Sequence, residues 1–113
     1  MEIQIIEVGS VMVASLVGDL DGNTAPQAQE EILAVCGPGV RILLDMTQLD
    51  YMSSAGARTL LLVYRQIKQN DGAVALAGLN QDIADMLSAT GFLDYFLVAT
   101  TVDEGLALFG TGS

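Results

Sequence analysis

Hydrophobic and polar positions alternate with two different periods along the chain, and their order predicts the architecture. Residues 2–8 and 11–17 are apolar runs rich in β-branched side chains, joined by Gly9 and Ser10, and this pattern predicts an antiparallel hairpin. Further short apolar runs, typical of strands, cover residues 40–45, 73–77 and 95–99.

Between these runs, apolar residues recur with the spacing of a helix that buries one face. The expected helices cover residues 24–36, 55–69, about 81–90 and 101–109. Thr24 with Gln27, and Thr101 with Glu104, have the spacing of a capping box, in which two side chains satisfy free N–H groups at a helix start. Asn80 is expected to cap the third helix.

A hairpin followed by alternating helices and strands predicts a single α/β domain with a mixed, mostly parallel sheet flanked by about four helices. We expect this domain to cover residues 1–109 and residues 110–113 to form a frayed tail. In such sheets the functional loops follow the carboxyl ends of the parallel strands. Two segments qualify, residues 18–26 and residues 45–56.

The charge balance narrows the classes of partner. Fourteen acids against four bases give a net charge of −10, which argues against nucleic acid or an anionic membrane as ligand. Three of the bases, Arg58, Arg65 and Lys68, fall in one expected helix, within about 80° of one another at 100° per residue. They form either a solvated face or a basic strip available to a partner. No apolar run is long enough to span a bilayer and the first residues do not resemble a signal peptide, so we expect a cytoplasmic protein.

Enzymatic function has little support in the sequence. Residues 18–24 resemble the DxDG(T) motif of haloacid-dehalogenase-like phosphatases, with Asp19 as nucleophile and Asp21 as acid/base, but Asn23 interrupts the motif. No Lys or Arg follows Lys68 to offset the phosphate charge. The chain has no His to activate a serine, and its one cysteine, Cys36, is expected in the core. We therefore expect no catalytic residue, no cofactor and no metal.

Two adjacent serines stand where the second parallel strand meets its helix, in the segment LDYMSSAGARTLL, residues 49–61. If the helix begins at Ala55, Ser54 lies at or beside its N-cap, where a hydroxyl accepts a backbone hydrogen bond. The same position, ahead of free N–H groups and a positive dipole end, also tolerates a phosphate. Ser54 is therefore either a helix cap or a modification site.

Two segments resemble one known family. Residues 44–61, LDMTQLDYMSSAGARTLL, look like the DSSG or DSTG signature of STAS domains of the bacterial anti-sigma factor antagonists. Residues 18–32 look like the GELD…TA segment of the same family, at the expected place before the first helix. The resemblance implies a single STAS-like domain. It also implies a partner that is both an anti-sigma factor and a serine/threonine kinase, which phosphorylates the first Ser of the signature, and a protein phosphatase that reverses the modification.

The resemblance places the phosphorylated Ser at Ser54 and the signature Gly at Gly56. Ser53 stands where the family has Asp, and Ala55 where it has a second Ser or Thr, so Ser54 is the first candidate and Ser53 the second. The expected partner-binding residues are Asp21, Asp50, Met52, Ser53, Ala55, Gly56 and Arg58. The alternative function is a STAS scaffold subunit of a transporter or signalling assembly that is not phosphorylated.

Overall fold

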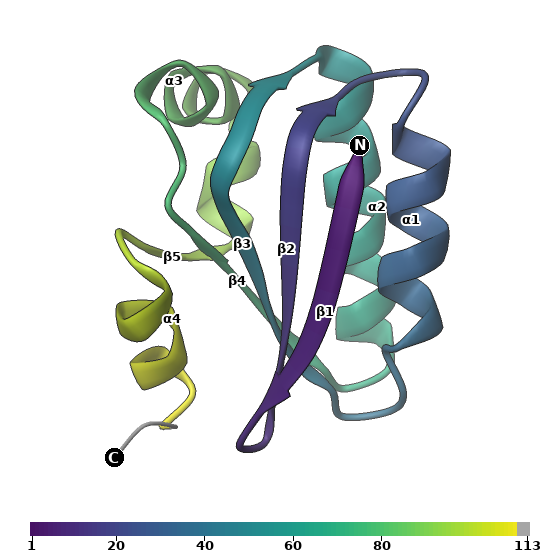
Figure 1. Ribbon diagram of the computed structural model, residues 1–113, viewed down its shortest axis with the longest axis vertical. Helices are drawn as coiled ribbons and strands as arrows, with labels where there is room; N and C mark the ends of the chain where they lie inside the picture. Colours follow the sequence, from purple (N-terminus) through teal and green to yellow (C-terminus); the bar gives the residue numbers. More distant parts are fainter. Residues whose placement is uncertain (111–113) are drawn as a thin grey trace.

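The computed structural model describes residues 1–110 and forms one five-stranded sheet with helices on both faces (Figure 1). The strands are β1 (Glu2–Val8), β2 (Val11–Leu20), β3 (Arg41–Met52), β4 (Ala73–Ala77) and β5 (Leu97–Ala99), in the order β1-β2-β3-β4-β5. The helices are α1 (Ala25–Ala34), α2 (Ser54–Gln69), α3 (Gln81–Thr90), the short 3₁₀ helix η1 (Phe92–Tyr95) and α4 (Val102–Leu108). β1 pairs antiparallel with β2, and the other three pairs are parallel, which confirms the predicted mixed, mostly parallel sheet.

The apolar side chains of the strands and helices form two cores, one on each face of the sheet. The larger core packs α1, α2 and α3 against the sheet, and the smaller one packs α4 against the other face. Gly105 of α4 is buried where a Cβ atom would lie within 3 Å of both methyl groups of Leu43, so glycine lets this short helix approach the central strand. Both faces of β3 and β4 are therefore covered, which explains their unbroken apolar runs.

Three expected strands differ from the structure. The strand expected at residues 11–17 continues to Leu20, into the loop expected at residues 18–26. The strand expected at residues 40–45 continues to Met52, so most of the loop expected at residues 45–56 is β-structure. Residues 95–99 were expected to be extended throughout, but Tyr95 closes η1 and only Leu97–Ala99 pair with β4. The Tyr64 ring of α2 packs on the rings of Tyr95 and Phe96, with centroids 5.6 and 5.1 Å away, and this contact accompanies the turn.

Of the three predicted helix caps, those at Asn80 and Thr101 are confirmed and the one at Thr24 is wrong. Asn80 caps α3 as expected, and Thr101 caps α4 with its Oγ1 accepting from the Glu104 N–H. The Glu104 carboxylate accepts a hydrogen bond from the N–H of Thr100, one residue before the cap. The Thr24–Gln27 capping box is wrong: the Thr24 side chain makes no capping bond to α1, and Gln27 donates to the Met1 carbonyl. The predicted tail includes residues 111–113, which lie outside the described residues.

Candidate functional site

The two serines at the end of β3 have different roles: Ser53 caps α2, and Ser54 is exposed. Ser53 is the N-cap of α2: its backbone is extended, and its Oγ accepts from the Gly56 N–H at 3.1 Å. Its own N–H donates to the Leu20 carbonyl at 2.9 Å, which ties the junction to the end of β2. Ser54 is thus the first helical residue and not the cap. The helix begins one residue earlier than expected.

Ser54 is exposed, and its hydroxyl takes part in no hydrogen bond with the other described residues. Ser53, in contrast, is half-buried and its hydroxyl is occupied by the cap. A group attached to the Ser54 oxygen displaces no internal hydrogen bond. A group attached to the Ser53 oxygen would compete with the cap of α2.

Gly56 allows α2 to begin directly against the sheet. A Cβ atom at this position would collide with the Leu20 carbonyl group, whose carbon would be only 2.9 Å away. The same Leu20 carbonyl accepts the Ser53 N–H, so the first turn of α2 and the end of β2 are in close contact. Gly56 therefore fixes where Ser54 lies relative to the β2–α1 loop.

Asp21 organises that loop through its own backbone neighbours. Its Oδ1 accepts from the N–H groups of Asn23, at 2.9 Å, and Thr24, at 3.1 Å. The Thr24 hydroxyl accepts from the Asp21 N–H and donates to the Asp19 carbonyl. These bonds explain why Thr24 does not form the expected capping box. They also give Asp21 a structural role in shaping the loop beside Ser54.

Two register shifts bring β3 to the junction. Between the pairs Ser15–Asp45 and Val17–Gln48, β3 advances three residues while β2 advances two, and a second shift follows Gly18. Asp45 holds the first shift by accepting from the Ser15 hydroxyl and from the N–H and hydroxyl of Thr47. β3 thereby stays paired with β2 up to Met52, immediately before the two serines.

A hollow of about 270 Å³ opens beside Ser54, between the end of β3, the start of α2 and α3. Its walls are Asp50, Tyr51, Met52, Ser53, Ser54, Asp82, Ile83 and Met86. Asn80 positions α3 here: its Nδ2 donates to the carbonyls of Leu49 and Asp50, and its Oδ1 accepts from the Ile83 N–H. The hollow combines an apolar floor with two carboxylates, a composition suited to a protein side chain with an apolar stem.

The structure brings most of the expected partner-binding residues to one end of the sheet but exposes only some of them. Asp50, Ser54 and Arg58 are exposed. Met52 and Gly56 are buried, which gives them a packing role under the site. Sequence reasoning missed Tyr51 and the α3 side chains of the hollow: Asp82, Ile83 and Met86. The signal that could have found the α3 side chains was the predicted Asn80 cap, because α3 follows β4, the neighbour of β3.

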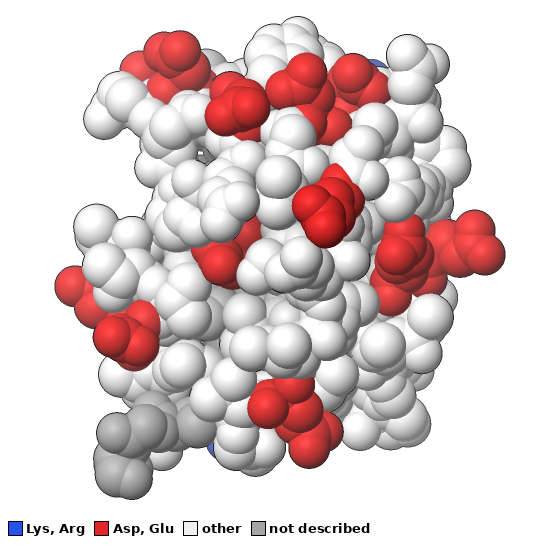
Figure 2. Space-filling model, viewed as in Figure 1, with Lys and Arg blue, Asp and Glu red and all other residues white. Residues whose placement is uncertain are grey.

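Charge is unevenly distributed over the surface. On the face shown in Figure 2, acidic side chains are widely spread and also cluster at the top, where Figure 1 places the start of α2 and α3. Lys and Arg show only as slivers at the margin of this view. Arg58, Arg65 and Lys68 are exposed on α2. The site therefore has an acidic side, toward Asp50 and Asp82, and a basic side along α2.

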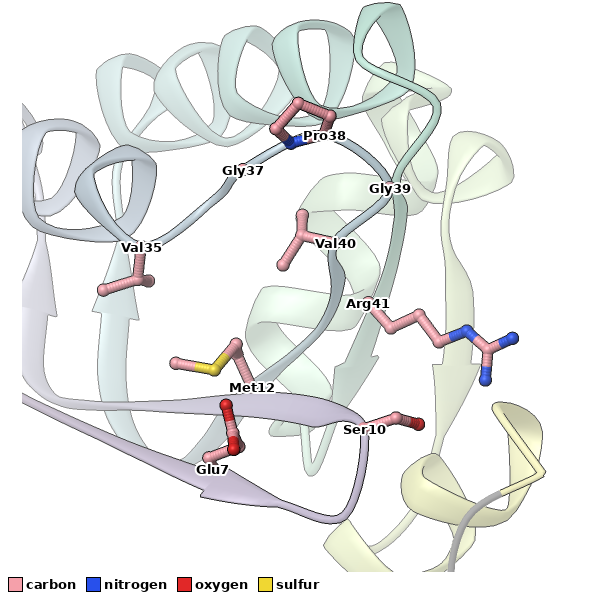
Figure 3. A pocket seen from close by; sticks show the side chains of 9 residues that line it. All are labelled: Glu7, Ser10, Met12, Val35, Gly37, Pro38, Gly39, Val40 and Arg41. Atoms are coloured by element: carbon pink, nitrogen blue, oxygen red, sulfur yellow. The ribbon is translucent and has the colours of Figure 1, made fainter.

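A second hollow, of about 350 Å³, lies at the opposite end of the parallel strands (Figure 3). It is bordered by Glu7, Met12 and the segment from Gly37 to Val40. In Figure 3 the Arg41 side chain points away from this space, and its Nη1 donates to the Phe109 carbonyl at 3.0 Å. This hollow is remote from the serines.

The family model of the STAS domain matches residues 2–105. The chain belongs to the STAS domain family. It is similar to BtrV of Bordetella bronchiseptica, a candidate anti-sigma factor antagonist, with 33% identity over 98% of this chain and 97% of that protein. Two solved structures show the same fold at 19% identity. An anti-sigma-factor antagonist (STAS) domain protein from Planctomyces limnophilus has a TM-score of 0.87 over 96% of this chain and 98% of its own. The Bacillus cell fate determinant SpoIIAA, in its phosphorylated form, has a TM-score of 0.71 over 96% and 99%.

Within residues 1–110, no three or more His, Cys, Asp or Glu side chains are grouped so that they could hold a metal ion. None of the helices in the same part of the chain has both the length and the apolar character needed to cross a bilayer.

Proposed function

We propose that this STAS domain is an anti-sigma factor antagonist, and that phosphorylation of Ser54 releases it from its anti-sigma factor. In the unmodified form it binds the anti-sigma factor, which frees the sigma factor for transcription in the cytoplasm. The anti-sigma factor is also the kinase. It transfers the γ-phosphoryl group of ATP to the Ser54 oxygen, while the hydroxyl proton passes to a base on the kinase and ADP leaves. A protein phosphatase restores the hydroxyl by hydrolysis and releases inorganic phosphate.

The observation that carries the proposal is the exposed Ser54 hydroxyl, free of internal hydrogen bonds, beside a Ser53 that is occupied as the N-cap. Ser53 replaces the Asp of the family signature, and both residue types are good N-caps, so the replacement leaves the helix start supported. The relative from Bordetella bronchiseptica is named as a candidate anti-sigma factor antagonist, and SpoIIAA has been solved phosphorylated. Both facts support the same function for this chain.

Release follows from charge placed in the contact surface. A phosphate adds about −1.5 to −2 charge beside Asp50 and Asp82. Burying an uncompensated charge in an interface costs several kcal/mol, and each 1.4 kcal/mol lowers affinity about tenfold. The fold itself is unaffected, because the Ser54 oxygen supports no other residue. Phosphorylation therefore changes binding and leaves stability nearly the same.

Titration calorimetry against the purified anti-sigma factor tests the proposal. We expect phosphoserine at position 54 to weaken binding at least tenfold, and Ser54→Ala to stay bound when kinase and ATP are present. Ser10→Ala, which removes an exposed hydroxyl at the opposite end of the sheet, is the matched control and should behave as the parent. Ser54→Asp carries less charge than phosphate and should have a partial defect.

The scaffold alternative makes the opposite prediction. A scaffold subunit would bind its partner equally well with and without phosphate on Ser54. Phosphopeptide mass spectrometry on protein isolated from its host would then find neither Ser53 nor Ser54 occupied.

A further inference from the structure

We propose that Arg58 is the positioning residue for the Ser54 phosphate, holding it in an ion pair along the outer face of α2. This inference rests on the proposed function, because it concerns the phosphorylated form. It assigns to Arg58 a role inside the modified chain, in addition to the expected role in partner binding.

The spacing of the two residues carries the first part of the argument. Ser54 and Arg58 lie four residues apart in a regular α-helix of 16 residues, and both are exposed. Four residues advance about 6 Å along the axis and place the side chains about 40° apart around it. Residues at this spacing are surface neighbours, with Cβ atoms about 5–6 Å apart. The long arginine side chain can reach a phosphate at that separation.

Arg58 is also available. It makes no hydrogen bond or ion pair with another residue in the described part of the chain, so pairing with a phosphate would break no existing contact. Its planar guanidinium can donate two parallel hydrogen bonds to phosphate oxygens. The other two bases of α2, Arg65 and Lys68, are less well placed, because they are 11 and 14 residues from Ser54. Those spacings correspond to about 16 and 21 Å along the axis, beyond the roughly 8 Å screening length of physiological salt.

The acidic residues beside Ser54 also favour a position of the phosphate near Arg58. Asp50 and Asp82 line the hollow on one side of Ser54, and their charge repels a phosphate from that hollow. Arg58 attracts it toward the outer face of α2. Phosphorylation thus adds a negative charge and at the same time occupies a cation that an unmodified surface would offer to the partner.

The geometry also distinguishes the two serines. Ser53 is five residues from Arg58, about 140° away around the helix axis, and its hydroxyl caps the helix. A phosphate on Ser53 would not reach Arg58 in the same way. The pairing is therefore specific for modification at Ser54.

The test uses the full chain with phosphoserine installed at position 54 by genetic encoding, and it measures the second pKa of the phosphate by ³¹P NMR. Arg58 stabilises the dianion, so Arg58→Gln should raise this pKa by about 0.3 units, which is about 0.4 kcal/mol at 1.36 kcal/mol per unit. Arg65→Gln removes the same charge from the same exposed helix face and should change the pKa by less than about 0.1. Arg58→Lys should restore part of the effect, and 1 M salt should abolish it.

A second measurement follows the Arg58 Nε–H resonance, which should shift when Ser54 is replaced by phosphoserine and should not shift in the unmodified Ser54→Ala protein. Equal pKa changes in Arg58→Gln and Arg65→Gln, with an unmoved Nε–H resonance, would overturn the pairing. Because the phosphate is encoded, this result does not depend on any kinase. Occupancy of Ser54 in the host tests the proposed function separately.

Discussion

The division of roles between the two serines predicts that their alanine variants differ in stability. Ser53→Ala removes the oxygen that accepts the Gly56 N–H and leaves that buried donor without its partner. Loss of an N-cap typically lowers the free energy of unfolding by about 1 kcal/mol, and leaving a buried donor unpaired moves the loss toward about 2 kcal/mol. Ser54→Ala removes an exposed hydroxyl that makes no internal hydrogen bond, so its effect should stay within about 0.5 kcal/mol.

Urea unfolding of the two variants and the parent measures these differences, with thermal melting as a second probe. For a domain of this size, 1 kcal/mol corresponds to a shift in Tm of about 4 °C. Two further variants control for the mechanism: Ser53→Asp keeps an N-cap acceptor and should match the parent, whereas Ser53→Gly also leaves the Gly56 N–H unpaired and should lose stability, by less than Ser53→Ala because glycine is the better N-cap residue. If Ser54→Ala proved as destabilising as Ser53→Ala, or more so, the assignment of the cap to Ser53 would be refuted.

Three other predictions concern a close contact, a buried thiol and the absence of phosphatase activity. Gly56→Ala should lower stability by about 1–3 kcal/mol because its methyl group meets the Leu20 carbonyl, whereas Gly37→Ala, with open space around the position, should be neutral or stabilising; urea unfolding compares them. Burial raises the pKa of the Cys36 thiol from 9.0 to about 11, so little thiolate is present at pH 8. Alkylation by iodoacetamide should therefore be slow there, rise as the pH approaches 11, and be fast at pH 8 in urea; rapid alkylation of the folded chain would contradict the burial. The purified protein should not hydrolyse an aryl phosphate, and magnesium-dependent turnover lost in Asp19→Asn would contradict its proposed function as a binding domain.

Much of the fold could be predicted because local signals and burial agree. The hairpin turn at Gly9 and Ser10, the Asn80 cap and the Thr101 cap lie where the sequence placed them. At each of these positions the local backbone preference coincides with the element boundary. The alternation of strands and helices then leaves few topologies, and the observed parallel crossovers are among them.

The end of β3 was harder to predict because long-range pairing decides it. Thr47, Gln48 and Asp50 are exposed polar residues, and their pattern reads locally as a loop. Pairing with β2 through two register shifts keeps this segment extended, and the hydrogen bonds of Asp45 hold the first shift. The helix start depends on the same contact, because the Leu20 carbonyl of β2 receives the Ser53 N–H. The sequence therefore predicts the start of α2 one residue too late, because local preferences do not include this contact with β2.

Under the proposed function, the one-residue difference between Ser53 and Ser54 separates the structural contacts of the site from its regulation. The contacts that fix the start of α2 against the end of β2 belong to Ser53 and Gly56: the cap, the N–H to Leu20, and the close approach without a side chain. Ser54 is adjacent in sequence but contributes none of these contacts. A phosphate there adds about 0.3–1 kcal/mol of favourable interaction with the helix end, too little to alter the fold. The same charge in an interface acts on a binding equilibrium, where it outweighs that small gain. If Ser54 is phosphorylated as proposed, a helix start with Ser53 turned inward and Ser54 outward can be modified repeatedly without being unfolded.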